Sequence, residues 1–155
     1  MKLIDYLNQD LIFVGVKADN KAGMLALLAE QVVKRYSGVN ADELRSKLLA
    51  REEAGSTGIG YGVAVPHATV GGLPQTVCMV VCTAEAIDFD AIDNTPVHII
   101  FLLVSPPWET GLHIKLLARI ARLIKSGVIL KTVSPAMSPK EVYDLIARED
   151  SRHVE

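Results

Sequence analysis

The amino-acid sequence predicts an α/β fold with three layers, in which helices cover both faces of a mixed β-sheet. Segments with strand-like and helix-like patterns alternate along the chain, which is typical of this class. The strand-like segments, such as TVCMVVCT and VHIIFLLV, are short and almost continuously apolar. Such runs indicate strands that are buried on both faces, and therefore a helical layer on each side of the sheet.

The first predicted elements are a strand and a helix. Residues 11–16, LIFVGV, are β-branched and apolar, which favours a strand. A helix is predicted over residues 21–36, because Asn20 suits its N-cap and Gly38 is placed to end it.

The chain then changes from helical to glycine-rich. A second helix is predicted to begin after Asn40, whose spacing to Glu43 resembles a capping box, and to fade near residues 51–53. Residues 54–72 contain six glycines in nineteen residues, interrupted by the apolar VAV. This pattern predicts a loop, a short strand and another loop.

The second half of the chain predicts a hairpin and two helices. Strands over residues 76–83 and 97–104 flank an acidic turn at residues 88–96, and an antiparallel hairpin there makes the sheet mixed. A long helix follows over residues 112–126. A last helix begins at Ser138, where SPKE supplies an N-cap, a proline at the first helical position and a glutamate at the third.

Composition indicates one globular domain over residues 1–155. Half of the residues are apolar and 22% are charged, which is enough apolar surface for one core. The formal net charge of -2 gives no general attraction to nucleic acid or to anionic lipid. The N-terminus lacks the apolar core of a secretory signal, and the longest apolar run, residues 99–104, is far shorter than the roughly 20 residues of a membrane helix. We expect a cytoplasmic protein without membrane insertion.

Cys78 and Cys82 lie in one predicted strand and point to the same side of it. Their α-carbons would be about 13 Å apart at roughly 3.3 Å per residue, whereas a disulfide requires less than about 7 Å. We expect two buried free thiols, which suits a reducing compartment.

His67 is the histidine whose position most suggests chemistry. It follows the short strand VAV and Pro66, which restrains the backbone, and it precedes a glycine-containing loop. Ligands of α/β sheets usually bind at strand ends, and glycines let another molecule approach closely. The pattern fits a functional histidine and a capped loop histidine equally well. His98, at a strand start, and His153, in a polar tail, are interpreted as ordinary surface side chains.

The long helix over residues 112–126 places His113 in its first turn, on the side expected to face the sheet. Successive residues rotate by about 100°, so the helix has two opposite stripes. The stripe expected to face solvent consists of Lys115, Arg119, Arg122 and Ser126. The stripe of His113 continues with Leu117, Ile120 and Ile124. At a helix N-terminus His113 can lie beside an anion; a core histidine bonded to a backbone carbonyl is the alternative.

The residue types favour phosphoryl transfer over metal-dependent or hydrolytic chemistry. Two histidines without a carboxylate at ligand spacing make a poor zinc site. Ser56, the serine near the loop, lacks the GxSxG context of a hydrolase nucleophile. A neutral imidazole nitrogen is a nucleophile near neutral pH, and positive charge stabilises the transferring group. We therefore expect neither a metal nor a cofactor.

The stretch REEAGSTGIGYGVAVPHA, residues 51–68, resembles the active-site motif of the fructose- and mannitol-type enzyme IIA family of the bacterial phosphoenolpyruvate-dependent phosphotransferase system. The segments AIDFDAIDNTPVHIIFLLVSP and HIKLLARIARLIKS continue the resemblance, which covers nearly the whole chain. Within this family, FDAIDNTPV is most similar to the nitrogen-regulatory branch.

This resemblance implies a role for three residues. His67 corresponds to the phosphoryl acceptor, which carries the phosphate on Nε2. His113 corresponds to a second active-site histidine that stabilises the phosphoryl group, and Arg51 to an arginine that helps to hold the anion. Two positions depart from the motif: Tyr61 stands where the nitrogen-type motif usually has Asn, and Ala68 stands where Gly is common.

The function implied is that of a phosphohistidine carrier in nutrient regulation. The donor is expected to be a histidine-phosphocarrier protein (HPr-like), and regulatory proteins are the expected targets. The first alternative is a fructose- or mannitol-type IIA subunit that passes phosphate to a sugar-specific IIB domain. The second is an interaction module of the same fold that carries no phosphate. The presence of both His67 and His113 favours the carriers over the module.

Overall fold

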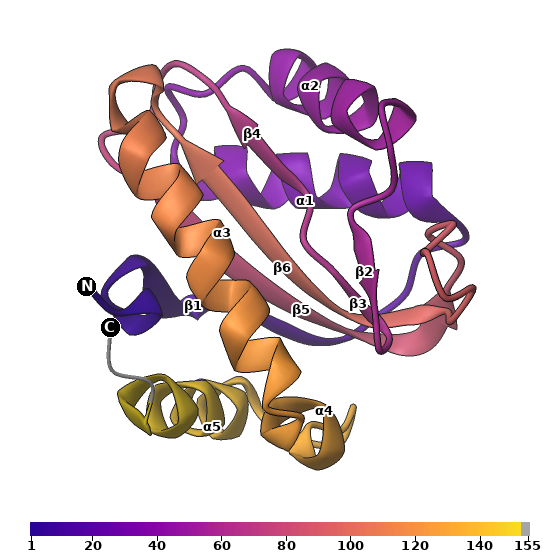
Figure 1. The fold of residues 1–155 in the computed structure, drawn as a ribbon. Helices are drawn as coiled ribbons and strands as arrows, with labels where there is room; N and C mark the ends of the chain where they lie inside the picture. Colours follow the sequence, from indigo (N-terminus) through magenta and orange to yellow (C-terminus); the bar gives the residue numbers. More distant parts are fainter. Residues whose placement is uncertain (153–155) are drawn as a thin grey trace.

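The computed structural model describes residues 1–152, and this part of the chain forms a mixed six-stranded β-sheet (Figure 1). The strands are β1 (Leu7–Val16), β2 (Gly58–Gly60), β3 (Val63–Ala64), β4 (His67–Thr69), β5 (Val77–Ile87) and β6 (Val97–Ser105). Their order is β1-β5-β6-β3-β2, and β4 also pairs with β6. β5 and β6 are antiparallel, whereas β1 runs parallel to β5, and β3 and β4 run parallel to β6. The predicted hairpin and mixed sheet are thereby confirmed.

Helices cover both faces of the sheet, as the sequence predicted. They are α1 (Lys21–Arg35), α2 (Ala41–Glu53), α3 (Thr110–Lys125), α4 (Val128–Thr132) and α5 (Pro139–Arg152), with the 3₁₀ turns η1 (Leu3–Tyr6) and η2 (Pro107–Glu109). α1 and α2 lie on one face, and α3, α4 and α5 lie on the other (Figure 1). None of the helices within residues 1–152 has both the length and the apolar character needed to cross a membrane.

Strand β5 shows why the central strands read as continuous apolar runs. Val77, Met79 and Val81 pack in the core beneath α1 and α2, whereas Cys78 and Cys82 pack in the core beneath α3 and α5. Both cysteines are buried and unbonded, which confirms the prediction of free thiols. Burial raises the pKa of Cys78 to about 12 and that of Cys82 to about 11, so both thiols stay protonated at neutral pH.

Three helices begin at the cap residues that the sequence indicated. The side chain of Asn20 accepts the backbone N–H three residues on at 2.8 Å, and Asn40 accepts that of Glu43 at 2.9 Å. Ser138 and Glu141 exchange side-chain to backbone hydrogen bonds at 3.2 and 3.0 Å, which is a complete capping box. These bonds involve neighbours in sequence, so the sequence alone was sufficient to locate them.

Other boundaries differ from the prediction because pairing partners, not local pattern, set them. β1 begins at Leu7 and β5 extends to Ile87, since neighbouring strands satisfy their backbone groups. α4 was not predicted. α1 ends through a hydrogen bond from the backbone N–H of Tyr36, and Gly38 does not end it as predicted. Gly38 instead packs on Gly72, whose carbonyl oxygen would lie 3.0 Å from a β-carbon at position 38.

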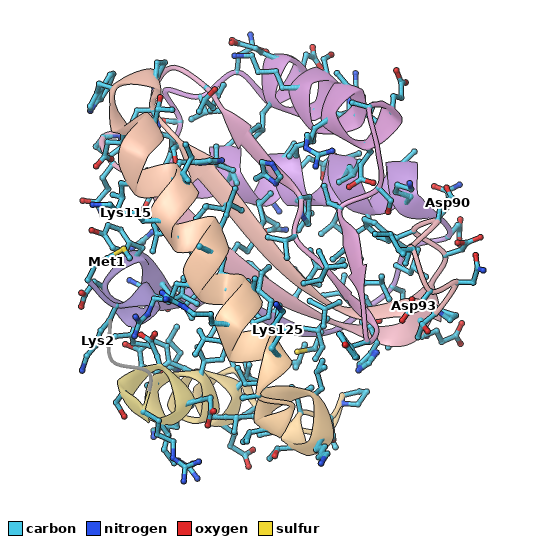
Figure 2. The ribbon with its side chains drawn as sticks, in the orientation of Figure 1. Met1, Lys2, Asp90, Asp93, Lys115 and Lys125 are labelled. Atoms are coloured by element: carbon cyan, nitrogen blue, oxygen red, sulfur yellow. The ribbon has the colours of Figure 1, made fainter. Side chains whose placement is uncertain are left out.

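Arg119 is buried, although the periodicity of its helix predicted it on the solvent side. Its Nε donates to Oδ1 of Asp150 at 2.6 Å, and its Nη2 donates to the Asp150 carbonyl oxygen at 2.8 Å. The backbone N–H of Ile4 donates to Asp150 Oδ2 at 3.0 Å. α5 and η1 therefore cover this flank of α3, which the pattern of α3 alone does not indicate. Lys115 and Lys125 lie on the outer side of α3 (Figure 2).

Candidate active site

The glycine-rich segment folds into three short strands, where one was predicted. β2 and β3 form a small hairpin at the sheet edge, and β4 then runs along β6. Strands of two or three residues are too short to show an alternating pattern, so only pairing reveals them. The glycine-rich segment thereby places His67 next to the end of β6.

His67 is the first residue of β4 and lies opposite Leu103 of β6. Its Nδ1 lies 2.8 Å from the carbonyl oxygen of Val65. Because a carbonyl only accepts hydrogen bonds, Nδ1 carries the ring proton and Nε2 of the neutral ring keeps a lone pair. The local bend of the chain thus fixes which nitrogen is nucleophilic.

Arg51 lies in the last turn of α2 and reaches the free nitrogen of His67. Its Nη1 donates to the carbonyl oxygen of Gly55 at 2.7 Å, which anchors the guanidinium at the start of the glycine-rich segment. Its Nε lies 3.3 Å from Nε2 of His67 and donates to the lone pair. The arginine therefore places positive charge directly beside the nucleophilic nitrogen.

His113 comes from the first turn of α3 and faces His67 across the site. The centres of the two rings are 5.5 Å apart and the ring planes are inclined by 60°. His113 is 7% exposed, and its Nδ1 lies 2.7 Å from the hydroxyl of Ser105 at the end of β6. The structure thus brings together all three residues that the sequence singled out, from α2, β4 and α3.

Two hollows flank His67, and Arg51 lines both. One, of about 300 Å³, is lined by Lys47, Arg51, His67, Ala68, Thr69 and His113. The other, of about 200 Å³, is lined by Arg51, Ser56, Thr57, Ile59, Val65, His67, Leu117 and Ala121. The first contains two cationic side chains and both histidines, which suits an anion, whereas the second is more apolar.

Both histidines are neutral at physiological pH. Burial lowers the pKa of His67 below its ordinary value, with a further lowering by Arg51 and an opposing effect of the Val65 hydrogen bond. Burial, with the neighbouring His67, lowers the pKa of His113 to about 4. A neutral His67 has its nucleophilic lone pair available.

Glu52, near the end of α2, connects this helix to the glycine-rich segment and to α1. Its carboxylate accepts the backbone N–H of Thr57 at 3.1 Å and also the Thr57 hydroxyl. Lys21 of α1 lies 3.2 Å from the same carboxylate and 3.3 Å from that of Asp90, which projects from the β5–β6 connection (Figure 2). These contacts hold the glycine-rich segment and α2 in a fixed relation.

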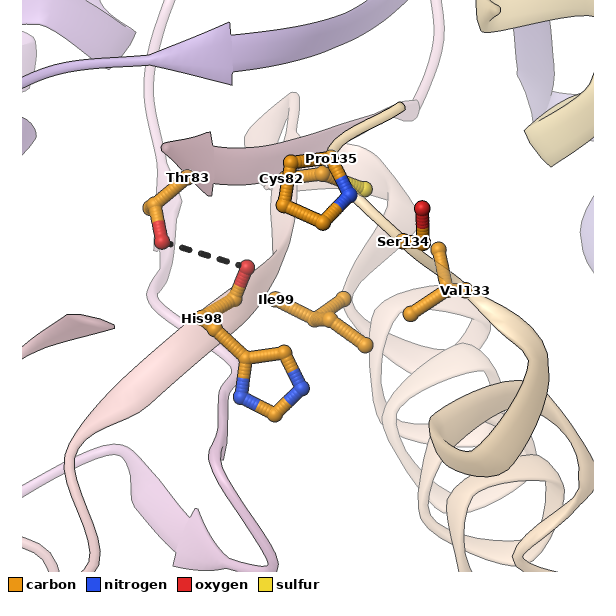
Figure 3. Close-up of a pocket in the computed structure, with 7 residues that line it drawn as sticks. All are labelled: Cys82, Thr83, His98, Ile99, Val133, Ser134 and Pro135. Atoms are coloured by element: carbon orange, nitrogen blue, oxygen red, sulfur yellow. Dashed lines mark hydrogen bonds between the residues drawn. The ribbon is translucent and has the colours of Figure 1, made fainter. Parts of the chain in front are cut away.

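His98 lies outside this site. His98, predicted to be an ordinary surface side chain, is half-buried and lines a small apolar cavity together with Cys82 and Pro135 (Figure 3). That cavity shares no lining residue with the hollows beside His67. His153 lies outside the described residues. Within residues 1–152, no three His, Cys, Asp or Glu side chains gather as metal ligands.

The sequence did not indicate Lys47, Thr69 or Ser105, although all three adjoin the site. Lys47 lies one helical turn before Arg51, and its Nζ donates to the carbonyl oxygen of Thr69 at 2.9 Å. The spacing of four residues was a usable signal, because it places both cations on one face of α2. No comparable sequence pattern indicated Ser105, because its contact with His113 depends on how α3 packs against the sheet.

Comparison with known proteins finds similar chains. Residues 5–149 match the model of the family described as "Phosphoenolpyruvate-dependent sugar phosphotransferase system, EIIA 2". The chain is 32% identical over 147 residues to the nitrogen regulatory protein of Bradyrhizobium diazoefficiens, covering 95% of each. It is similar to the crystal structure of the nitrogen regulatory protein IIA-Ntr from Neisseria meningitidis (TM-score 0.83, 31% identity, 93% and 98% covered). It shares its fold with the mannitol enzyme IIA in a complex with phosphorylated mannitol enzyme IIB from Escherichia coli (TM-score 0.74, 21% identity, 91% and 96% covered).

Proposed function

The chain belongs to the EIIA type 2 family of the phosphoenolpyruvate-dependent phosphotransferase system, and on that premise we propose that it carries a phosphoryl group on Nε2 of His67. The donor is a histidine-phosphocarrier protein, and the carrier works in the cytoplasm in nutrient regulation. One observation carries the proposal: the Nε2 lone pair of His67 lies beside Arg51 and a hollow that His113 and Lys47 also line.

The transfer step requires no cofactor. The N–H of Arg51 that donates to Nε2 of His67 turns to a phosphoryl oxygen, which frees the Nε2 lone pair. The lone pair attacks the phosphorus atom of the donor's phosphohistidine, and a new N–P bond forms as the donor's N–P bond breaks. The electron pair of the broken bond returns to the donor's imidazole. Throughout this step the proton stays on Nδ1 of His67, where it is hydrogen-bonded to the carbonyl oxygen of Val65. Arg51 and Lys47 supply the positive charge that phosphoryl transfer needs.

A regulatory role has direct support among the relatives. Those that are more than 30% identical over nearly the full chain are nitrogen regulatory proteins. The phosphorylation state of His67 would then report nutrient status to regulatory protein targets. The alternative is a sugar-specific subunit, favoured by the shared fold with a mannitol enzyme IIA that is found with its phosphorylated IIB partner. Transfer of phosphate from the loaded carrier to a purified mannitol or fructose IIB domain would identify the sugar-specific subunit.

The proposal is tested by phosphate incorporation. We expect the wild-type protein to become labelled when it is incubated with ³²P-phosphoenolpyruvate, the upstream kinase and the histidine-phosphocarrier protein. The variant His67→Ala should take up no label, because the accepting nitrogen is gone. The variant His98→Ala is the matched control, since His98 lies outside both hollows, and it should be labelled at the wild-type rate. Labelling of His67→Ala, or no labelling of the wild type, would overturn the proposal.

A further inference from the structure

We propose that two buried hydroxyls, those of Thr76 and Ser105, hold His113 in the tautomer whose proton is on Nε2, so that this histidine donates a hydrogen bond to the phosphoryl group. The inference rests on the proposed function and deepens it. It makes Ser105 and Thr76 positioning residues for the transfer, acting through His113.

The contacts form one continuous chain from η2 to the site. The Ser105 hydroxyl lies 2.7 Å from Nδ1 of His113, and the Thr76 hydroxyl lies 3.0 Å from that of Ser105. The carboxylate of Glu109 accepts the backbone N–H of Thr76 at 2.8 Å. Ser105 and Thr76 are completely buried, so bulk water does not compete for these hydrogen bonds.

The direction of the chain follows from counting protons. The Thr76 hydroxyl has one proton and two acceptor neighbours, Ser105 Oγ at 3.0 Å and Glu109 Oε1 at 3.3 Å. The contact to Ser105 Oγ is the shorter of the two, and the hydroxyl proton is assigned to it. Ser105 then gives its own proton to Nδ1 of His113. A neutral imidazole that accepts at Nδ1 carries its proton on Nε2.

The opposite direction is incompatible with a role in holding phosphate. If Nδ1 of a neutral His113 donated to Ser105, its Nε2 would present a second lone pair beside that of His67. Phosphoryl oxygens in the hollow would then face the lone pair on Nε2 of His113, which cannot donate a hydrogen bond to them. In the proposed direction the two rings, 5.5 Å apart, are complementary. His67 presents a lone pair that forms the bond, and His113 presents a proton that stabilises the transferred oxygens.

The test combines nitrogen NMR with transfer rates. In long-range ¹H–¹⁵N spectra of the wild-type protein at neutral pH, His113 should show a pyridine-like Nδ1 and a pyrrole-like Nε2. Ser105→Ala and Thr76→Val should shift the His113 Nδ1 resonance and lower the transfer rate roughly tenfold, the effect of one hydrogen bond to a charged group. Thr83→Val is the matched control: Thr83 is a buried threonine of β5 whose hydroxyl contacts the His98 carbonyl oxygen, and its change should alter neither readout.

The outcomes separate this inference from the proposed function. A wild-type spectrum with a pyrrole-like Nδ1 on His113 would overturn the inference, even if a variant failed to fold. Unchanged His113 resonances in folded Ser105→Ala would overturn it as well. The NMR measurement requires no phosphate transfer. A protein that takes up no label but shows the expected tautomer would therefore refute the carrier function and leave the hydrogen-bond chain intact.

Discussion

At the scale of single residues, the site depends on two imidazoles with different environments. Nδ1 of His67 donates to a backbone carbonyl two residues earlier in the chain, whereas Nδ1 of His113 contacts the hydroxyl of Ser105 at the end of the preceding strand, β6. Both rings are partly or fully withdrawn from water, which disfavours their charged forms. The site therefore has its positive charge on Arg51 and Lys47, and both histidines remain neutral.

The depressed pKa of His113 predicts a pH-dependent stability. The unfolded protein takes up a proton near pH 6.5, whereas the folded protein does so only near pH 4, so acid favours the unfolded state. At about 1.4 kcal/mol per pKa unit, the full effect is about 3 kcal/mol. The stabilisation is complete above pH 6.5 and is lost as the pH falls towards 4.

Urea unfolding at pH 7 and pH 4 measures this effect. We expect His113→Asn, which cannot titrate but retains a group for Ser105, to lose about 3 kcal/mol less than the wild type between the two pH values. Titrating groups that do not interact with His113 act in the same way in both proteins and cancel in the difference. Equal losses in the two proteins would show that His113 is not held neutral.

At the scale of elements, the hairpin between β2 and β3 explains a departure in the motif. Its two turn residues, Tyr61 and Gly62, have φ of 60° and 79°. Two positive φ values are the requirement of a type I′ turn, for which Asn-Gly is the favoured sequence. Asn at this position, as the resemblance led us to expect, tolerates the left-handed region, whereas Tyr is strained there.

Tyr61→Asn should therefore stabilise the protein. We expect a gain of about 1 kcal/mol, seen as a rise of roughly 2–4 °C in the thermal midpoint, because the side chain of Tyr61 is 65% exposed and little packing is lost. The bond from the backbone N–H at this position to Asp93 is kept. Tyr61→Ala is the control: it retains a β-carbon at positive φ and should give no such rise. A fall in the midpoint of Tyr61→Asn would contradict the explanation.

At the scale of the whole molecule, the buried carboxylate of Asp150 connects the two ends of the described chain. Asp150 of α5 is completely buried and contacts Arg119 of α3 and the backbone of Ile4 in η1. Figure 1 shows η1 and the end of α5 side by side beneath α3. The pair thus ties the layer on this face of the sheet to the N-terminal turn.

Removing the carboxylate of Asp150 should destabilise the folded protein. We expect Asp150→Asn to lower the free energy of unfolding by about 3–5 kcal/mol, because the buried guanidinium of Arg119 loses the negative charge that lies 2.6 Å from its Nε. The matched control is Asp144→Asn, which removes an exposed carboxylate of the same helix that pairs with Lys140. Its cost should be at most about 1 kcal/mol. Similar values for the two variants by urea denaturation would show that the buried pair does not anchor α5.

The sequence was sufficient to predict the class of fold, and it indicated the histidines of the candidate site. Continuous apolar strands require cover on both faces, and helix caps depend on neighbours, so both can be read locally. His67 and His113 were indicated by their positions after a strand and at a helix start. Three features could not be read from the sequence: the short strand of His67, the burial of Arg119, and the hydroxyls beside His113. Each depends on how separate helices and strands pack against one another, and the pattern within a single element does not report that packing.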